Sequence, residues 1–194
     1  MRIVRYLKNN EPVFGWVKDG LVGEIAGDPF GEFHRSEPDT DLNSLEILAP
    51  IAPSKIICVG RNYAAHAKEH NSEVPDIPLI FLKPPSSLLA QDGTILLPPQ
   101  SERVEHEAEL VVVIRKEGRW IEIEEAGDYI YGFTIGNDVT ARDLQRADSQ
   151  WTRGKGFDTF CPIGPWIDTE FDYADKMISC RVNGQIKQMG STSE

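Results

Sequence analysis

The amino-acid sequence predicts a β-rich α+β fold with short helices. Two hairpin signals support this prediction, because Asp19-Gly20 and Asn183-Gly184 each lie between runs of apolar and β-branched residues. Short apolar runs also recur between Pro and Gly residues, as buried strands do, whereas stretches of helical composition are few and short. Strands are therefore expected to dominate the fold.

The N-terminal fifty residues are predicted to be β structure. Residues 12–17 and 21–25 flank the Asp19-Gly20 turn and should pair as a hairpin. Residues 27–42 are rich in Gly, Pro, Asp, Glu and Ser, which predicts a connecting loop.

A second unit follows, in which strands again outnumber helices. Asn is a favourable N-cap, and Asn-Gly is the most favoured two-residue hairpin turn. The predicted elements are a strand at 55–59, a helix at 62–70 capped by Asn62, strands at 79–83, 105–114 and 129–135, a helix at 141–150, and a hairpin of 178–182 with 185–189.

Length and charge exclude several classes of protein. The 194 residues fit one domain with a small appendage. The net charge of −11, from 31 acidic against 20 basic residues, argues against nucleic-acid binding. No apolar run reaches the ~20 residues of a membrane helix, and the N-terminus lacks a signal-peptide h-region. Three widely spaced cysteines, with no CxxC pair, suit a reducing cytoplasm.

The acidic stretch at residues 105–114 is the most informative in the chain. In a strand, Glu105, Glu107 and Glu109 would share one face. Like charges in a row need solvent or a cation, and oxygen ligands suit Mg²⁺, Mn²⁺ or Ca²⁺. This stretch alone is compatible with two interpretations, a metal site or a solvated sheet edge.

Asp138 adds a further carboxylate where a predicted strand meets a predicted helix. It could cap that helix, because Asp is a good N-cap, or it could be a third metal ligand. Arg142 and Gln145 follow at i, i+3 spacing and so share a helical face, and Lys155 lies in a predicted Gly-flanked loop. This local excess of basic residues indicates either a nearby anionic ligand or simple surface solubilisation.

His66 and Glu69 also have i, i+3 spacing on the predicted helix at 62–70. A carboxylate beside an imidazole fixes its tautomer and raises its basicity, as in a general base that takes a proton from water. The alternative is an ordinary ion pair on the helix surface.

Five separate motifs together resemble the fumarylacetoacetate hydrolase family over residues 55–192. They are Gly60-Arg-Asn-Tyr-Ala-Ala-His-Ala-Lys-Glu69, Ile80-Phe-Leu-Lys-Pro84, Glu107-x-Glu109, Gly136-Asn-Asp-Val-Thr-Ala-Arg-Asp-Leu-Gln145 and Lys155-Gly-Phe-Asp-Thr-Phe160. The resemblance implies a mixed β roll or sandwich with short helices, with a small N-terminal β domain at 1–50 and a catalytic domain at 51–194. It also implies a homodimer, and a natural chain that continues beyond Glu194.

The resemblance also implies roles for the candidate site residues. Metal ligands would be Glu107, Glu109 and Asp138, for Mg²⁺ or else Mn²⁺ or Ca²⁺. His66 and Glu69 would activate water together with Lys155 as a further catalytic residue, and the substrate would be bound by Arg61, Lys83, Arg142 and Gln145.

The function implied by the resemblance is metal-dependent chemistry on small anionic 2-oxo or 2-enol carboxylic acids through a metal-bound enolate. C–C hydrolysis or decarboxylation of acylpyruvate or oxaloacetate type is the first expectation. An isomerase or decarboxylase acting on 2-hydroxyhepta-2,4-diene-1,7-dioate in aromatic catabolism is the alternative. A further alternative is a metal-stabilised binding module without catalysis.

Overall fold

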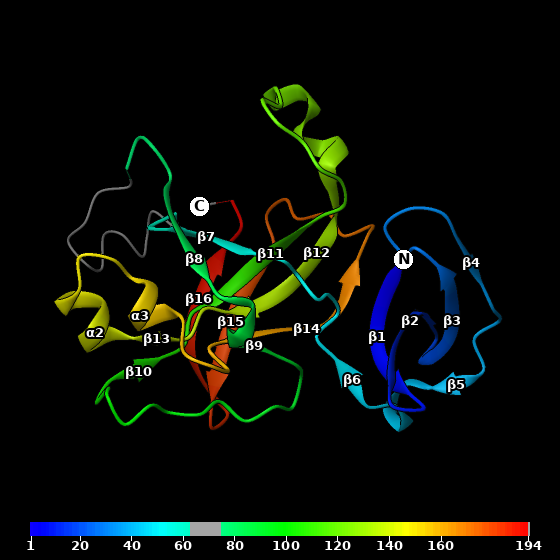
Figure 1. Cartoon of the computed structure of the whole chain (residues 1–194), viewed down its shortest axis with the longest axis horizontal. Helices are drawn as coiled ribbons and strands as arrows, with labels where there is room; N and C mark the ends of the chain where they lie inside the picture. The colour runs from blue at the N-terminus through cyan, green and yellow to red at the C-terminus, as the bar shows by residue number, and fades with distance from the viewer. Residues whose placement is uncertain (63–74, 194) are drawn as a thin grey trace.

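The structure is a computed structural model that describes residues 1–62 and 75–193, and it is rich in strands (Figure 1). The strands are β1 (Arg2–Lys8), β2 (Glu11–Lys18), β3 (Leu21–Gly27), β4 (Phe33–Arg35), β5 (Thr40–Asp41), β6 (Ile47–Leu48), β7 (Ile56–Gly60), β8 (Leu79–Lys83), β9 (Leu88–Leu89), β10 (Val104–Glu105), β11 (Ala108–Ile114), β12 (Ile130–Asn137), β13 (Thr140–Ala141), β14 (Cys161–Asp168), β15 (Met177–Val182) and β16 (Gln185–Ser191). The short helices are η1 (Leu42–Ser44), η2 (Pro85–Ser87), η3 (Ile123–Tyr129), α2 (Arg142–Ala147) and α3 (Thr152–Lys155). The predicted β-rich class with short helices is confirmed.

One large sheet runs in the order β11-β12-β14-β1-β2-β3-β4, and β5, β6 and β9 pair alongside it. Its strands are antiparallel except for β9, which runs parallel to β14. Strand β1 joins β14 through the pair Ile3 and Ile167, so the N-terminal strands continue the sheet that contains β11 and β12. Strands β1–β5 lie at one end of the molecule, and α2 and α3 at the other (Figure 1). The division at residue 50 stays a prediction.

Both predicted hairpins are confirmed. Strands β2 and β3 close across the pair Lys18 and Leu21, and the turn residues Asp19 and Gly20 have φ of 52° and 80°. Strands β15 and β16 close at Asn183-Gly184, where φ is 52° and 77°. Positive φ at both central residues matches the twist of the flanking strands, which explains why Asp-Gly and Asn-Gly predict these turns.

Two apolar clusters form part of the core of the described residues. Val4, Tyr6 and Val22 form the first cluster within the N-terminal strands. Val139, Ala141 and Phe160 form the second, which lies next to the end of β12 and the start of α2. The second cluster therefore anchors the backbone directly after Asp138.

Three predicted elements differ from the structure. Residues 27–42 are not a plain loop, because β4 and β5 use the backbone groups of β3 as partners. The strand predicted at 105–114 breaks between β10 and β11, since β10 pairs with β13 and β11 with β12. The helix predicted at 141–150 covers only Arg142–Ala147, because Ala141 belongs to β13.

The helix predicted at 62–70 lies largely outside the described residues. Strands predicted at 55–59, 79–83 and 129–135 are confirmed as β7, β8 and β12. Within the part of the chain that the structure describes, no helix has the length and apolar character needed to cross a membrane.

Candidate active site

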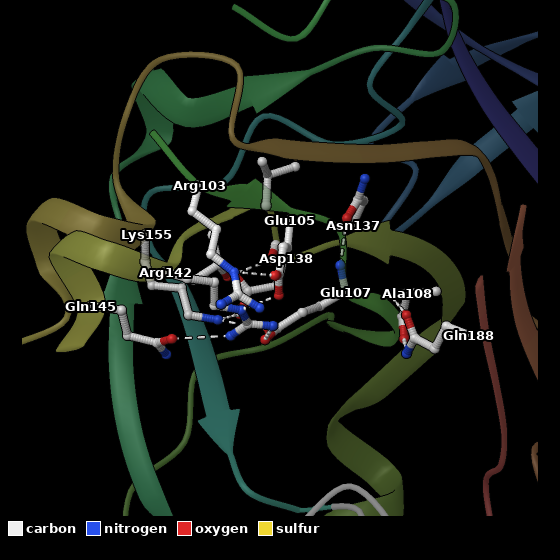
Figure 2. A network of polar contacts seen from close by, with 12 residues as sticks. Arg103, Glu105, Glu107, Ala108, Asn137, Asp138, Arg142, Gln145, Lys155 and Gln188 are labelled. Atoms are coloured by element: carbon white, nitrogen blue, oxygen red, sulfur yellow. Dashed lines mark hydrogen bonds and ion pairs between the residues drawn. The ribbon is translucent and has the colours of Figure 1, made fainter. Parts of the chain in front are cut away.

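The candidate carboxylates meet where β11 begins and β12 ends. These strands are antiparallel, and the pairing of Ala108 with Asn137 brings Glu107 next to Asp138. The Asp138 backbone N–H donates to the Glu107 carbonyl over 2.8 Å. Figure 2 shows both side chains in one polar network. Two residues separated by 31 positions are thus held side by side by strand register.

Two buried lysines converge on these carboxylates. Lys83, the last residue of β8, places Nζ 2.6 Å from Asp138 Oδ1 and 3.2 Å from the Val139 carbonyl. Lys155, the last residue of α3, places Nζ 2.6 Å from Asp138 Oδ2 and 2.7 Å from Glu107 Oε2. Each lysine is only 2% exposed. A buried ammonium requires such partners, because an unpaired charge away from water is very costly.

Arg142 completes the cationic side of the cluster. Its Nη2 lies 2.6 Å from Glu107 Oε1, and its Nε lies 2.8 Å from Glu105 Oε2. Its Nη1 donates to Gln145 Oε1 over 3.0 Å, which confirms that these two residues share one helical face. Arg103 binds the other oxygen of Glu105 at 2.6 Å. The guanidinium therefore uses its planar fork to hold three acceptors in fixed directions.

The three candidate ligands have different proton affinities. Burial alone would raise the pKa of Glu107, but Lys155 and Arg142 lower it overall. Burial raises the pKa of Asp138, and Lys155 and Lys83 offset this only in part. Burial, together with the charges of Glu107 and Asp138, raises the pKa of Glu109 to about 8. Negative charge is thus least compensated at Glu109.

The residues present fit an oxygen-preferring divalent cation. Glu107, Glu109 and Asp138 supply only oxygen donors, and the raised pKa of Glu109 marks a local shortage of positive charge. Among the described residues, no three His, Cys, Asp or Glu side chains are placed around one point as metal ligands. Both oxygens of Glu107 and of Asp138 accept from nitrogen donors instead. Holding a cation would require Lys155 or Lys83 to release an oxygen.

A broad open cleft of about 1630 Å³ reaches the cluster. Lys83, Glu109 and Asp138 line it together with apolar residues of β7 and β11. Cys58 and Cys161 also line the cleft, and burial raises the pKa of these thiols to about 12 and about 11. Both cysteines are therefore neutral thiols near pH 7, which makes them poor nucleophiles.

The alternatives that the sequence left open are decided at several positions. Asp138 is not the N-cap of α2, because Ala141 takes that place and the Asp138 carboxylate binds lysines instead. Lys155 ends a short helix rather than lying in a loop. Arg142 and Lys155 are buried, so they do not serve surface solubility. Glu107 is mostly buried as well, unlike a side chain on a solvated sheet edge.

One predicted site residue that the structure describes does not join the cluster. Arg61 is exposed and follows β7 with φ of 56°. His66 and Glu69 lie outside the described residues. Their predicted role as a water-activating pair stays a prediction.

Sequence reasoning missed three residues that belong to the network, and it gave Glu105 of the acidic stretch no role in the site. Glu105 orients Arg142, and Arg103 binds Glu105 in turn. Asn137 accepts the Glu107 backbone N–H at 2.9 Å, and its position next to Asp138 could have suggested it. Gln188 binds the backbone of Ala108 from 80 residues away, which no local pattern predicts.

Comparison with known families identifies the family to which the chain belongs. Residues 55–194 match the sequence profile described as "Fumarylacetoacetate (FAA) hydrolase C-terminal". The chain belongs to the fumarylacetoacetate hydrolase family. Residues 1–50 match a second profile, described as "Rv2993c-like, N-terminal". The resemblance inferred from five motifs is thereby confirmed.

Similar proteins in this family have several activities in their names. The solved 5-carboxymethyl-2-hydroxymuconate delta-isomerase of Mycobacterium smegmatis is 41% identical, with a TM-score of 0.89 over 100% of this chain and 76% of that one. Oxaloacetate tautomerase Fahd2a, mitochondrial, of Rattus norvegicus is 46% identical over 197 residues, which are 99% of this chain and 59% of the relative.

A third relative was solved with ligands. Maleylpyruvate hydrolase from Sphingobium sp. SYK-6, in complex with a manganese(II) ion and pyruvate, is 25% identical, with a TM-score of 0.76 over 99% of this chain and 77% of that one. Relatives in this family are thus enzymes that include isomerases, tautomerases and hydrolases.

Proposed function

We propose that this protein is a divalent-metal-dependent enzyme that acts on small anionic 2-oxo or 2-enol carboxylic acids. The observation that carries the proposal is the buried cluster of Glu107, Asp138, Lys83, Lys155 and Arg142 at a large cleft. Buried charges in a cleft are typical of active sites. The manganese and pyruvate in the maleylpyruvate hydrolase relative support the same class of cofactor and ligand.

In this proposal, Glu107, Glu109 and Asp138 hold Mg²⁺, or else Mn²⁺ or Ca²⁺. The cation, when bound, supplies Lewis-acid stabilisation of negative charge that develops on substrate oxygens. Lys83 and Lys155 would then turn their ammonium groups from the carboxylates towards an anionic substrate. Arg142, fixed by Glu105, keeps the Glu107 carboxylate in place during this exchange.

Two types of reaction are compatible with this chemistry. C–C hydrolysis or decarboxylation, of acylpyruvate or oxaloacetate type, is the first candidate. In the hydrolysis, His66 and Glu69 would activate the water. Isomerisation or tautomerisation is the second candidate, including action on 2-hydroxyhepta-2,4-diene-1,7-dioate in aromatic catabolism. The names of the isomerase and tautomerase relatives favour this second candidate. Both need stabilisation of an enolate next to a carboxylate.

A substrate panel tests the proposal. Acylpyruvates, oxaloacetate and 2-hydroxyhepta-2,4-diene-1,7-dioate would be assayed with Mg²⁺, with Mn²⁺ and after exhaustive chelation. We expect turnover of at least one substrate that chelation abolishes and added metal restores. Loss of an outer-shell partner of a metal ligand typically lowers activity about 10- to 100-fold. Glu107→Ala removes a proposed ligand itself, so it should lower turnover by more than this. Glu11→Gln, an exposed change on β2, is the control and should leave turnover unchanged.

Two outcomes separate the alternatives. Activity that survives chelation would rule out the metal mechanism. Metal binding without turnover of any substrate would favour a metal-stabilised binding module. His66→Ala should abolish hydrolysis but spare metal binding if His66 activates water, whereas retained hydrolysis would exclude that role.

We further propose that the protein is a cytoplasmic homodimer. Large apolar side chains of β8 outside the cleft are exposed, among them Ile80 at 62% and Leu82 at 54%. A face of this kind is typical of protein interfaces. Light scattering should give a mass of about 43 kDa, twice the 21.7 kDa of one chain. A mass equal to one chain would exclude the dimer.

A further inference from the structure

The backbone that connects the two candidate glutamate ligands is held mainly by side chains. Strand β11 is the outermost strand in the order of the large sheet, and its ladder begins only at Ala108. The Glu107 N–H donates to Asn137 Oδ1, and its carbonyl accepts from the Asp138 N–H. The Ala108 N–H and carbonyl both bind Gln188. Three of these four backbone groups thus depend on a side-chain amide.

Gln188 forms a two-point contact with a single residue. Its Oε1 accepts from the Ala108 N–H at 2.7 Å, and its Nε2 donates to the Ala108 carbonyl at 3.0 Å (Figure 2). A side-chain amide carries a donor and an acceptor together, so it can replace the backbone of a neighbouring strand. Two simultaneous bonds fix the direction of the Ala108 peptide groups as well as their position.

A register shift in the β15–β16 hairpin directs the Gln188 side chain towards β11. Cys180 pairs with Gln188, whereas the next residue, Arg181, pairs with Ile186. Lys187 is therefore an extra residue on β16, which makes a β-bulge. Bulges redirect the side chain that follows them and are frequent next to active sites. A regular hairpin would not present Gln188 in the same way.

We propose that Gln188 is a positioning residue of the candidate metal site, which sets the separation of the Glu107 and Glu109 carboxylates by fixing Ala108 between them. The proposal rests on the proposed function, since it assumes that these carboxylates bind a cation. Ala108 directly follows Glu107 and precedes Glu109, so a rotation of its peptide groups moves both ligands. Outer-shell partners of metal ligands act in this way.

The test is the Mn²⁺ affinity of the 194-residue chain, measured by electron paramagnetic resonance titration of free Mn²⁺. Gln188→Met keeps the length of the side chain but removes both hydrogen bonds. We expect its Kd for Mn²⁺ to rise about 10- to 100-fold. The matched control is Gln185→Met, because Gln185 is exposed on the same strand, and its Kd should equal that of the wild type.

A second variant distinguishes positioning from general folding. Gln188→Asn keeps the amide on a shorter side chain, so its Kd should lie between those of the wild type and Gln188→Met. Circular dichroism at the titration temperature checks that each variant is folded. Loss of folding in both Gln188 variants would count against the proposal, because it would assign Gln188 to the fold as a whole.

Glu109→Gln separates failure of this inference from failure of the metal site. If Glu109→Gln abolishes Mn²⁺ binding but Gln188→Met binds like the wild type, the positioning role is wrong and the proposed function stands. If the wild-type chain binds no Mn²⁺, the metal site is wrong and the role of Gln188 falls with it.

Discussion

Two buried regions of this protein differ in what fills them. Between the N-terminal strands, Val4, Tyr6 and Val22 pack as an apolar cluster. At the end of β12, Lys83 and Lys155 are buried against carboxylates. Apolar burial stabilises the fold in proportion to the area removed from water. Buried ion pairs gain little net stability, yet they become very costly when one partner is lost. The first region therefore stabilises the fold, whereas the ion pairs of the second add little net stability but must stay intact.

The largest expected effect comes from breaking the charged region. Lys155→Met leaves Glu107 Oε2 and Asp138 Oδ2 without their shared ammonium group. We expect the free energy of unfolding at pH 7 to fall by about 3–5 kcal/mol, as for other buried pairs that lose one partner. Urea denaturation in EDTA measures this. A variant as stable as the wild type would show that the cluster tolerates uncompensated charge.

The next effect concerns pH. The folded-state pKa of Glu109 is raised to about 8 from an ordinary value of 4.5, so the folded chain binds this proton more tightly than the unfolded chain. Its contribution to stability is full below about pH 4.5 and is lost as the pH rises to about 8. Glu109→Gln should remove this pH-dependent loss of stability when stability is measured in EDTA, that is, without a bound metal.

Urea denaturation midpoints at pH 5 and pH 9 measure the pH effect. The wild type should lose more stability between these values than Glu109→Gln does. Equal losses in the two proteins would mean that Glu109 does not titrate in this range. Glu11→Gln, at the exposed start of β2, serves as the matched control and should retain the wild-type loss.

A smaller effect is expected in the apolar region. Ile3 is fully buried and pairs with Ile167 on β14. Ile3→Val removes one methylene, so stability should fall by about 0.5–1.5 kcal/mol. This loss should be the same at pH 5 and pH 9 and with or without Mn²⁺, since no charge is involved. A metal-dependent loss would show that the two regions are coupled through β14.

The smallest effect is expected at an exposed ion pair. Lys8 binds Glu24 on the N-terminal strands, where water screens the charges. Lys8→Met should leave the urea midpoint nearly unchanged, in contrast to the same substitution at Lys155. A similar loss at both lysines would mean that burial does not distinguish these two pairs.

Sequence reasoning succeeded where the controlling interactions are local. Asp19-Gly20 and Asn183-Gly184 predicted both hairpins, because a two-residue turn depends on the φ angles of its own residues. The i, i+3 spacing of Arg142 and Gln145 predicted their contact on one turn of helix. Motif spacing identified the fumarylacetoacetate hydrolase family.

Tertiary structure alone decided how the side chains of the site contact one another and what holds their backbone. The break before β11 could not be predicted, because β10 and β11 pair with different strands whose register depends on the whole sheet. Lys83 reaches Asp138 across 55 residues, and Gln188 reaches Ala108 across 80. Contacts of such separation arise from strand register and packing, whereas turns and helix spacing are determined by a few neighbouring residues.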